Sequence, residues 1–330
     1  MITSRTMTRA HLISNPQARG VSPTLERTVT AALAARFSLR ITRTGGRDGA
    51  IDVARRAIGD GEDLLIVFGG DGLVNEVVNG MAGSDATLAI IPGGTMNVFA
   101  RNLGIPADPL AATERILAGA ERGALRLATL GLAGERYFTF ACGCGFDAET
   151  AARVEAHRAA KHQWGEPYFY AAALTTLLRS YISRKPFLRC AGSFGVEEAV
   201  MAIALMGDTY AYLAGWPLRL TAGMRSVEAG RAAKVGSEVR GSAGPSPQQS
   251  RIASPKLSVF ILRRFTYGRL PAYALGTLTG RFGPDALAVT GLEEFEVSSA
   301  GPLPCHVDGE PLAPTRRVLV RVAPWSVPIL

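Results

Sequence analysis

A glycine-rich loop follows a buried apolar strand directly, and it constrains the fold more than any other part of the sequence. Residues Leu64–Phe68 read LLIVF, and residues Gly69–Met81 read GGDGLVNEVVNGM. A short apolar run bounded by glycines, followed at once by helical spacing, is typical of a strand buried on both faces of a parallel sheet. Ligands bind beyond the carboxyl ends of such strands. The loop therefore predicts an α/β fold with a binding site at this end of the strand.

Strands and helices alternate through the first part of the chain. Strand-like apolar runs and segments of helical spacing succeed one another at residues 10–16, 23–37, 39–44, 49–60, 64–68, 73–81 and 87–92. Parallel strands need crossover connections, and these are usually helices. We therefore expect an α/β domain over residues 1–128.

The pattern changes from about residue 125 to short β-like runs separated by turn signals, which is typical of an antiparallel sandwich or barrel. One long helical segment, at 148–183, interrupts them. Residues 227–255 are rich in Gly, Ser, Ala and Pro and have no apolar period, so we expect a flexible loop there. The second predicted domain is a mainly antiparallel β-sandwich over residues 129–330.

Composition narrows the possible partners without choosing one. The chain of 330 residues has 36 Lys and Arg against 28 Asp and Glu, a net charge of +8, which favours nucleotide phosphates, anionic lipid or nucleic acid. Residues 1–15 lack the apolar core of a signal peptide, and no apolar run approaches the roughly 18 residues of a membrane span. We expect a cytoplasmic protein. The four scattered cysteines indicate reduced core thiols, with no metal–thiolate site.

The loop contains one residue whose charge needs an explanation. Glycines bring backbone N–H groups close to phosphate oxygens, but the Asp71 carboxylate would repel a phosphate unless Mg²⁺ lies between them. On spacing alone, Asp71 could equally be the N-cap of a tight strand–helix turn. A second loop, Pro92–Pro106, reads PGGTMNVFARNLGIP and again follows a strand with glycines, a hydroxyl and an amide. Two such loops favour a metal–nucleotide site.

Five motifs together resemble the catalytic family of diacylglycerol kinases and sphingosine kinases, including the bacterial soluble lipid kinases. In chain order they are SNPQARG at 14–20, GGDGLVNEVVNG at 69–80, PGGTMNVFARNLGIP at 92–106, GCGFDAET at 143–150 and VDGEP at 307–311. The resemblance covers nearly the whole chain. It implies an N-terminal nucleotide-binding domain like that of NAD kinases and a C-terminal β-sandwich that receives the lipid.

The same resemblance implies site residues by position. Those expected to line the ATP site are Asn15, Thr44, Gly69, Gly70, Asp71, Gly72, Glu76, Thr95 and Asn97. Asp308 and Glu310 match the catalytic acids of the family, and Asp71 is the third catalytic carboxylate; Asp71 and Asp308 are the candidate Mg²⁺ ligands. Asp147 matches a residue that lies near the substrate head group in relatives.

Two departures from the family pattern bear on the acceptor and on a metal. Leu73 occupies a position at which bacterial members usually carry threonine and sphingosine kinases carry leucine. A ceramide or sphingoid acceptor therefore stays open beside diacylglycerol. The aspartates that help to hold an ancillary Mg²⁺ in relatives are missing after the YLAGWPLRL segment at 212–220. We expect that ancillary site to be absent.

Three other functions fit parts of the sequence. NAD kinases share the GGDG loop; a non-catalytic lipid- or nucleotide-binding module would suit the positive charge. GCGFDA at 143–148, with Glu166 as a ribose-binding acid, also fits a dinucleotide-binding fingerprint. The order of the five motifs favours the lipid kinase over all three.

The expected reaction is in-line transfer of the γ-phosphoryl group of ATP to a lipid hydroxyl, with Glu310 or Asp308 accepting the proton. Basic groups flank the helical segment and favour reversible contact with the anionic inner face of a membrane; they are Arg153, Arg158, Lys161, Arg179, Arg184 and Lys185. We expect no nucleic-acid partner. His11, His157, His162 and His306 are expected to be structural.

Overall fold

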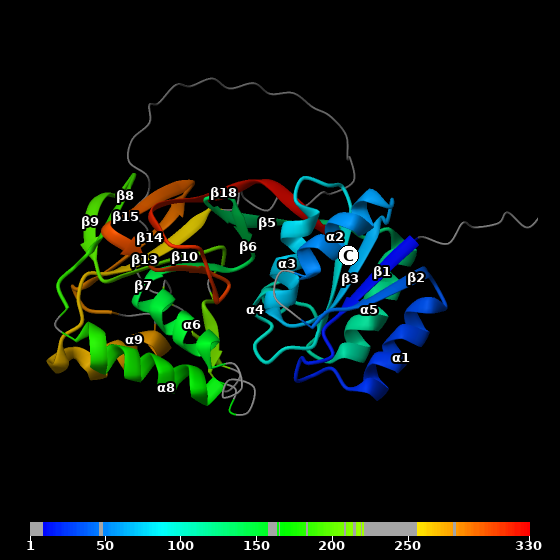
Figure 1. The fold of residues 1–330 in the computed structure, drawn as a ribbon, viewed down its shortest axis with the longest axis horizontal. Coiled ribbons are helices and arrows are strands. Elements are labelled where there is room, and N and C mark those ends of the chain that lie inside the picture. The colour runs from blue at the N-terminus through cyan, green and yellow to red at the C-terminus, as the bar shows by residue number, and fades with distance from the viewer. Residues whose placement is uncertain are drawn as a thin grey trace, which may run out of the picture.

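The computed structural model describes residues 9–45, 49–157, 164, 166–182, 184–207, 209–213, 216–218, 220, 256–279 and 282–330. These residues form two lobes that lie side by side (Figure 1). The predicted flexible loop at 227–255 lies outside the described residues, as do Arg158, Lys161 and His162. The predicted boundary at residue 128 stays a prediction.

The first lobe is built around four parallel strands in the order β2-β1-β3-β4. The strands are β1 (Arg9–Ser14), β2 (Ser38–Arg43), β3 (Leu64–Gly69) and β4 (Thr87–Pro92). Helices follow them in the chain: α1 (Pro23–Ala34), α2 (Gly49–Gly59), α3 (Asp71–Met81), α4 (Val98–Asn102) and α5 (Pro109–Arg122). Parallel pairing with intervening helices confirms the α/β character expected of this part.

Helices cover both faces of this sheet, which explains the uninterrupted apolar strand. Leu65 and Val67 of β3 belong to the core cluster that contains α2 and α3, whereas Ile66 and Phe68 belong to the cluster that contains α1. Alternate side chains of a strand point to opposite faces, so both sets must be apolar. The central strands β3 and β4 are thus buried, whereas the edge strand β2 is mostly exposed.

The second lobe is a sandwich of two mainly antiparallel layers, as expected. One layer has the order β14-β13-β10-β7-β16-β17. Its strands are β7 (Ala141–Gly145), β10 (Met201–Leu205), β13 (Leu257–Leu262), β14 (Ala286–Leu292), β16 (Cys305–Val307) and β17 (Glu310–Pro311). The other contains β8 (Leu188–Gly192), β9 (Gly195–Ala199), β15 (Glu294–Leu303) and β18 (Thr315–Ile329). Apolar side chains of both layers share one core cluster.

Helices α6 (Phe146–Ala156), α8 (Glu166–Thr176) and α9 (Leu270–Thr279) lie along one side of this lobe (Figure 1). A short π-helical turn, Leu177–Tyr181, continues α8, and a 3₁₀ turn, Tyr267–Arg269, precedes α9. A small hairpin pairs β11 (Ala211–Leu213) with β12 (Trp216–Leu218). None of the helices in the described parts of the chain is both long and apolar enough to cross a membrane.

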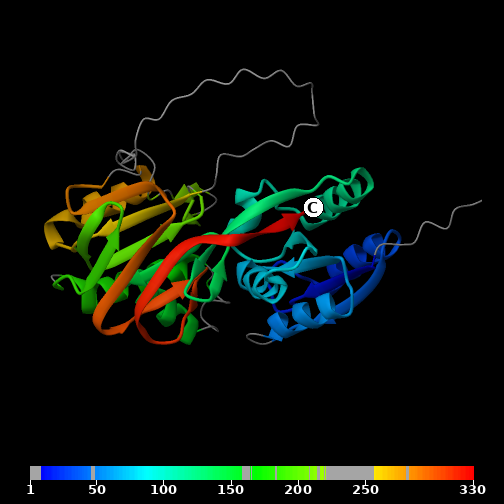
Figure 2. The ribbon, with the colours of Figure 1, turned by 90° about the horizontal axis from the view of Figure 1, so that it is seen from above.

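Strand β18 joins the two lobes. Figure 2 shows it running from the second lobe into the first. It pairs antiparallel with β15 in the second lobe and with β5 (Arg126–Ala133), and at its end Ile329 pairs parallel with Leu88 of β4. Strand β6 (Arg136–Phe138) extends this sheet by pairing with β5. The first-lobe sheet therefore continues into the second lobe through one long strand.

The cysteines lie in the core, as expected. Cys142, Cys144, Cys190 and Cys305 are all buried and free. Cys144 and Cys305 lie opposite each other on β7 and β16, with their sulfurs 3.0 Å apart. They fill the sandwich core as small apolar side chains.

Candidate functional site

The two glycine loops of the first lobe pack against each other through their backbones. The Gly93 N–H donates to the Gly69 carbonyl at 2.8 Å, and the Gly20 N–H donates to the Gly93 carbonyl at 2.8 Å. A Cβ added to Gly94 would lie 2.5 Å from the Gly70 Cα. Side chains at these positions would hold the loops apart, so the glycines are needed for this close approach.

Helix α3 begins at Asp71, two residues earlier than the helical pattern starting at Leu73 had predicted. Gly70 is its N-cap and supplies no side-chain hydrogen bond. The N–H groups of the first turn of a helix have no acceptor within the helix and point outward from its positive end. The glycine loop therefore presents unsatisfied donors beyond the end of β3.

Asp71 itself connects the two loops. Its carboxylate accepts hydrogen bonds from the Val98 N–H at 3.0 Å and the Phe99 N–H at 3.2 Å, at the start of α4. It caps a helix, as one reading of the sequence allowed, but the helix is α4 and not its own. Burial raises the pKa of Asp71 to about 6, against the opposing effect of these backbone hydrogen bonds.

The second loop is shaped by Asn97, which has a left-handed backbone with φ of 48°. Its side-chain amide spans the loop: Oδ1 accepts from the Gly94 N–H at 2.9 Å and Nδ2 donates to the Gly94 carbonyl at 2.8 Å. Asparagine tolerates this backbone conformation better than most residues. Thr95 lies at the exposed tip between them.

The remaining predicted ATP-site residues lie at the ends of neighbouring elements. Asn15 follows β1 and accepts a hydrogen bond from the Gln17 N–H at 2.9 Å. The Thr44 N–H donates to the Ser14 carbonyl at 2.8 Å, which holds the end of β2 against the end of β1. Glu76 is buried in α3 and accepts from the Ala50 N–H at 3.0 Å, in the first turn of α2. Its carboxylate stabilises that helix end.

Glu310 approaches the first glycine loop from the second lobe. A Cβ on Gly72 would lie 2.9 Å from Glu310 Oε1. Arg136 Nη2 donates to Glu310 Oε2 at 3.2 Å, and Arg136 Nε donates to Asn75 Oδ1 of α3 at 3.2 Å. The structure thus brings a half-buried carboxylate to the start of α3, within reach of anything bound there.

Asp308 has a different environment, because its carboxylate accepts five hydrogen bonds. Oδ1 accepts from the backbone N–H groups of Phe140 and Ala141, both at 3.0 Å. Oδ2 accepts from the Thr139 N–H at 2.7 Å, the Thr139 hydroxyl at 2.9 Å and Asn75 Nδ2 at 2.7 Å. A carboxylate offers about four lone-pair sites, and these donors use them all.

The expected role of Asp308 as a metal ligand stays a prediction, and its hydrogen bonds argue against it. With its lone pairs directed at protein donors, the carboxylate has none for Mg²⁺. Among the described residues, no three acidic, histidine or cysteine side chains converge on a possible metal position. Asp71 still fits a single metal contact, since each of its oxygens has one donor, and Mg²⁺ on a nucleotide commonly takes one or two carboxylates.

The Asp308–Gly309 pair forms the two-residue turn between β16 and β17, in which Val307 pairs with Glu310. Both turn residues have positive φ, 49° and 85°. Hairpin turns of this kind favour Asp-Gly because they require left-handed backbone at both positions. The motif is therefore a hairpin turn that also carries the Glu310 side chain to the glycine loop.

Asp147 lies at the start of α6 and is buried. His306 Nε2 is 2.6 Å from Asp147 Oδ2, and the Tyr210 hydroxyl donates to Oδ1. His306 Nδ1 accepts from the Gly309 N–H at 3.1 Å. Burial beside the Asp147 carboxylate raises the pKa of the Tyr210 hydroxyl well above its ordinary range. The predicted head-group residue is thus linked to the hairpin turn.

Four residues of this assembly were missed from the sequence: Asn75, Arg136, Thr139 and Tyr210. Asn75 gave one usable signal, because Asn75 and Asn79 lie four residues apart, and so on one face, in an otherwise mainly apolar helical segment. Their partners are far away in sequence, and the residues themselves form no motif. His306 was noted as structural, and its contact with Asp147 could not be read from spacing.

GCGFDA does not form a dinucleotide-binding unit. Gly143 and Gly145 belong to β7, whose neighbours β10 and β16 are both antiparallel. The fingerprint requires a parallel βαβ unit. The structure therefore excludes this alternative.

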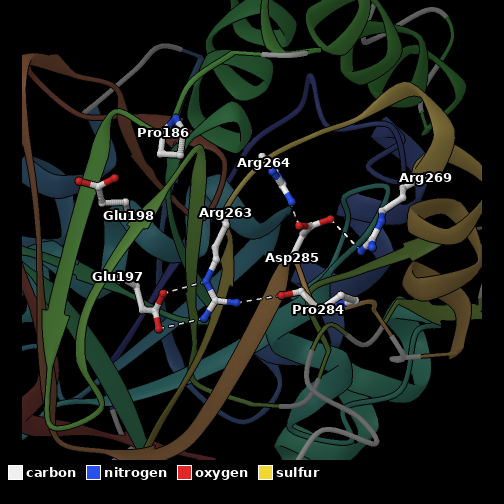
Figure 3. A pocket seen from close by; sticks show the side chains of 8 residues that line it. All are labelled: Pro186, Glu197, Glu198, Arg263, Arg264, Arg269, Pro284 and Asp285. Carbon is white, nitrogen blue, oxygen red and sulfur yellow. Dashed lines mark hydrogen bonds and ion pairs between the residues drawn. The ribbon is translucent and has the colours of Figure 1, made fainter.

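A separate pocket of about 460 Å³ is lined by residues of the second lobe (Figure 3). Five of its charged side chains are paired with one another: Arg263 bonds both oxygens of Glu197, at 2.8 and 2.9 Å, and Arg264 and Arg269 bond Asp285. None of the predicted site residues lines it. We place the candidate site at the glycine loops, where the predicted residues converge.

Comparison with known proteins identifies a family resemblance in the first lobe. The sequence model of the diacylglycerol kinase catalytic domain matches residues 9–126. Residues 9–126 are thus similar to the catalytic domain of diacylglycerol kinases. The matched residues contain both glycine loops and end at the start of β5.

Curated relatives match a short segment only. A diacylglycerol kinase of Bacillus subtilis (strain 168) is 54% identical over 63 residues, 18% of this chain and 21% of the relative. A diacylglycerol kinase of Staphylococcus aureus (strain JH9) is 47% identical over 68 residues, 20% of this chain and 22% of the relative. The matched segments thus span about a fifth of these relatives.

Solved structures extend the similarity to the whole fold. A diacylglycerol kinase structure from Bacillus anthracis str. Sterne superposes with a TM-score of 0.63 at 20% identity, covering 98% of this chain and 97% of the other. A second structure from that strain gives a TM-score of 0.70 at 22% identity, covering 100% and 97%. At this identity the likeness concerns the two-lobed fold.

Proposed function

We propose that this protein is a lipid kinase that transfers the γ-phosphoryl group of ATP to the hydroxyl of a membrane lipid, with diacylglycerol as the first candidate. The observation that carries the proposal is the catalytic-domain match over residues 9–126. The curated relatives named above are diacylglycerol kinases. We also propose that the first lobe binds nucleotide in the manner of NAD kinases.

In this proposal the phosphates of ATP lie at the start of α3, against Gly69–Gly72. Backbone N–H groups and the positive helix end favour anions at this position. Asn15, Thr44, Thr95 and Asn97 would complete the walls of the nucleotide site. The buried Glu76 would support the nucleotide site indirectly, because its carboxylate holds the start of α2.

Mg²⁺ is the proposed cofactor, with Asp71 as its protein ligand. When bound, it would neutralise negative charge on the phosphates. Asp71 would have a second function, because its contacts with α4 also fix the second glycine loop. The metal proposal does not extend to Asp308.

Glu310 is the proposed base that orients the lipid hydroxyl and accepts its proton. Glu310 fits this task better than Asp308, because the Glu310 side chain is partly exposed and faces the start of α3. The carboxylate oxygens of Asp308 already accept five hydrogen bonds. Phosphoryl transfer passes through a loose transition state, so positioning contributes more than the base does. We propose that Asp308 serves the reaction by fixing the turn that carries Glu310.

The lipid would approach from the second lobe, where the helices carry both apolar and basic groups. Leu174, Leu178 and Leu275 are at least half exposed, and Arg179 and Lys185 are exposed near the end of α8. Such a surface suits transient contact with the anionic inner face of a membrane. We propose that the enzyme acts there as a peripheral cytoplasmic protein.

Ceramide and sphingoid acceptors are proposed as alternatives to diacylglycerol. Leu73 is the residue that suggested these acceptors, and it packs in the core with its Cδ2 beside Gly69. It therefore acts through the shape of the loop and not by touching a lipid. Asp147 remains the proposed reader of the head group; each of its oxygens has one protein donor, which leaves capacity for a further hydrogen bond.

The test is to incubate the purified chain with labelled ATP and a panel of diacylglycerol, ceramide, sphingosine and NAD, and to identify the phosphorylated product. We expect phosphorylated diacylglycerol, and no turnover in folded Asp71→Asn or Glu310→Gln variants. Phosphorylation of NAD alone would overturn the proposal in favour of a NAD kinase. Near-normal turnover in folded Asp71→Asn would remove Asp71 from the mechanism.

A further inference from the structure

The imidazole of His306 joins two parts of the candidate site that the sequence keeps far apart. His306 lies in β16, is 3% exposed, and contacts Asp147 of α6 on one side and Gly309 of the hairpin turn on the other. Gly309 immediately precedes Glu310. The side chain therefore lies between the proposed lipid-reading carboxylate and the proposed base.

The hydrogen-bond directions fix which ring nitrogen carries the proton. The backbone N–H of Gly309 can only donate, so Nδ1 of His306 accepts with its lone pair. Nε2 must then carry hydrogen and donate to Asp147 Oδ2 at 2.6 Å. This neutral tautomer makes one acceptor bond and one donor bond in fixed directions.

Two neighbouring features are arranged around this contact. Gly143 pairs with His306 across β7 and β16, and a Cβ at this position would collide with both Asp147 Oδ2 and His306 Nε2. The Tyr210 hydroxyl bonds the other oxygen of Asp147 and fixes the carboxylate plane. His306 Nδ1, which accepts from the Gly309 N–H, is thereby held in a buried, closely packed position.

We infer that His306 is a positioning residue for phosphoryl transfer: it fixes the Gly309 N–H, and so the direction in which the turn presents Glu310. The inference rests on the proposed function for its effect on catalysis. Asp308 holds the turn on one side through five hydrogen bonds, and His306 holds it on the other through one. A small displacement of a reacting group costs up to about 100-fold in rate.

Two amide substitutions separate the two bonds of the imidazole. In His306→Asn, the amide oxygen lies near the position of Nδ1 and can accept from Gly309, but the side chain is too short for Asp147. In His306→Gln, the longer amide reaches Asp147 and leaves Gly309 without its acceptor. The two variants differ by one methylene. His11→Asn is the matched control, since His11 of β1 is equally buried and bonds Thr42 of β2.

The experiment measures kcat, KM for ATP, unfolding midpoint and Gly309 amide hydrogen exchange for the full chain, with diacylglycerol in mixed micelles. We expect kcat to fall by about 100-fold in His306→Ala and His306→Gln, with KM for ATP changed less than about threefold, because binding is retained while alignment is lost. His306→Asn should keep a kcat about tenfold above that of His306→Gln, and His11→Asn should match the wild type.

Exchange at Gly309 separates this inference from the proposed function. It should quicken in folded His306→Gln and His306→Ala and stay slow in His306→Asn. If His306→Gln keeps as much kcat as His306→Asn, or if Gly309 exchange is unchanged in it, the positioning contact is overturned. A wild type that phosphorylates no lipid alcohol overturns the proposed function, whereas the exchange pattern still decides whether His306 holds the turn.

Discussion

The two sides of the candidate site are held in shape by different means. On the first-lobe side, the loops at 69–72 and 93–97 touch through glycine backbones, with Gly94 directly over Gly70. On the second-lobe side, a single carboxylate, Asp308, accepts five hydrogen bonds and ties the turn to residues 139–141 and to Asn75. Backbone contacts spread stabilisation over many groups, whereas the carboxylate concentrates it in one side chain. Single substitutions should reveal this difference.

The largest effect is expected from Asp308→Ala. Removing the carboxylate leaves several buried donors without an acceptor, and each such group costs about 1–3 kcal/mol. Some will find water, so we expect the free energy of unfolding to fall by about 3–5 kcal/mol, measured by urea denaturation. A loss no greater than that of Asp60→Ala, whose carboxylate pairs with Arg40 at the surface, would remove the contrast between the two sides.

Gly94→Ala tests the backbone-packed side. The new Cβ would lie 2.5 Å from the Gly70 Cα, so the two loops must separate. Overpacking of this kind costs about 1–3 kcal/mol, and nucleotide affinity should fall with it. Gly59→Ala is the control, because a Cβ there meets nothing within 4 Å. Equal thermal stability of the two variants would show that the close loop contact is unimportant.

The smallest effect concerns Asp71 and pH. Its pKa is raised from the ordinary value of 3.8 to about 6 in the folded chain, so between these values the folded state binds more protons than the unfolded state. Its contribution to stability therefore falls as pH rises from about 4 to 6. Relative to Asp71→Asn, the nucleotide-free wild type should lose about 1 kcal/mol over this interval, allowing for partial solvent screening. A difference that rises or stays flat between pH 4 and 7 would contradict the raised pKa.

The sequence predicted the first-lobe side well because its determinants are local. The apolar run Leu64–Phe68 predicts a buried strand, and the glycines after it form a recognisable motif. Both strand ends and both loops lie within a few residues of the signals that predicted them. The start of α3 differed, because the helix begins inside the glycine loop, and the segment expected as the second loop contains helix α4.

The second-lobe side was less predictable because its contacts join distant residues. Asp308 could be recognised by resemblance, but its donors at Asn75 and Thr139 lie far earlier in the chain and belong to no motif. The same holds for Arg136, whose contact with Glu310 depends on how β6 crosses α3. The hairpin β8–β9 and helix α9 also gave no clear pattern. Their placement depends on tertiary packing, which overrides weak local preference.

Strand β18 has a consequence for how the protein is made. The edge of β4 is covered by the far end of β18, through the pairing of Ile329 with Leu88 and the Leu330 N–H bond to the Leu88 carbonyl. During synthesis the first-lobe strands emerge early, yet this edge stays open until the ribosome has translated the strand that closes it. Open strand edges pair with other chains, and distant pairings form slowly. A nascent chain stalled before residue 315 should therefore associate edge to edge, and completing translation should end that exposure.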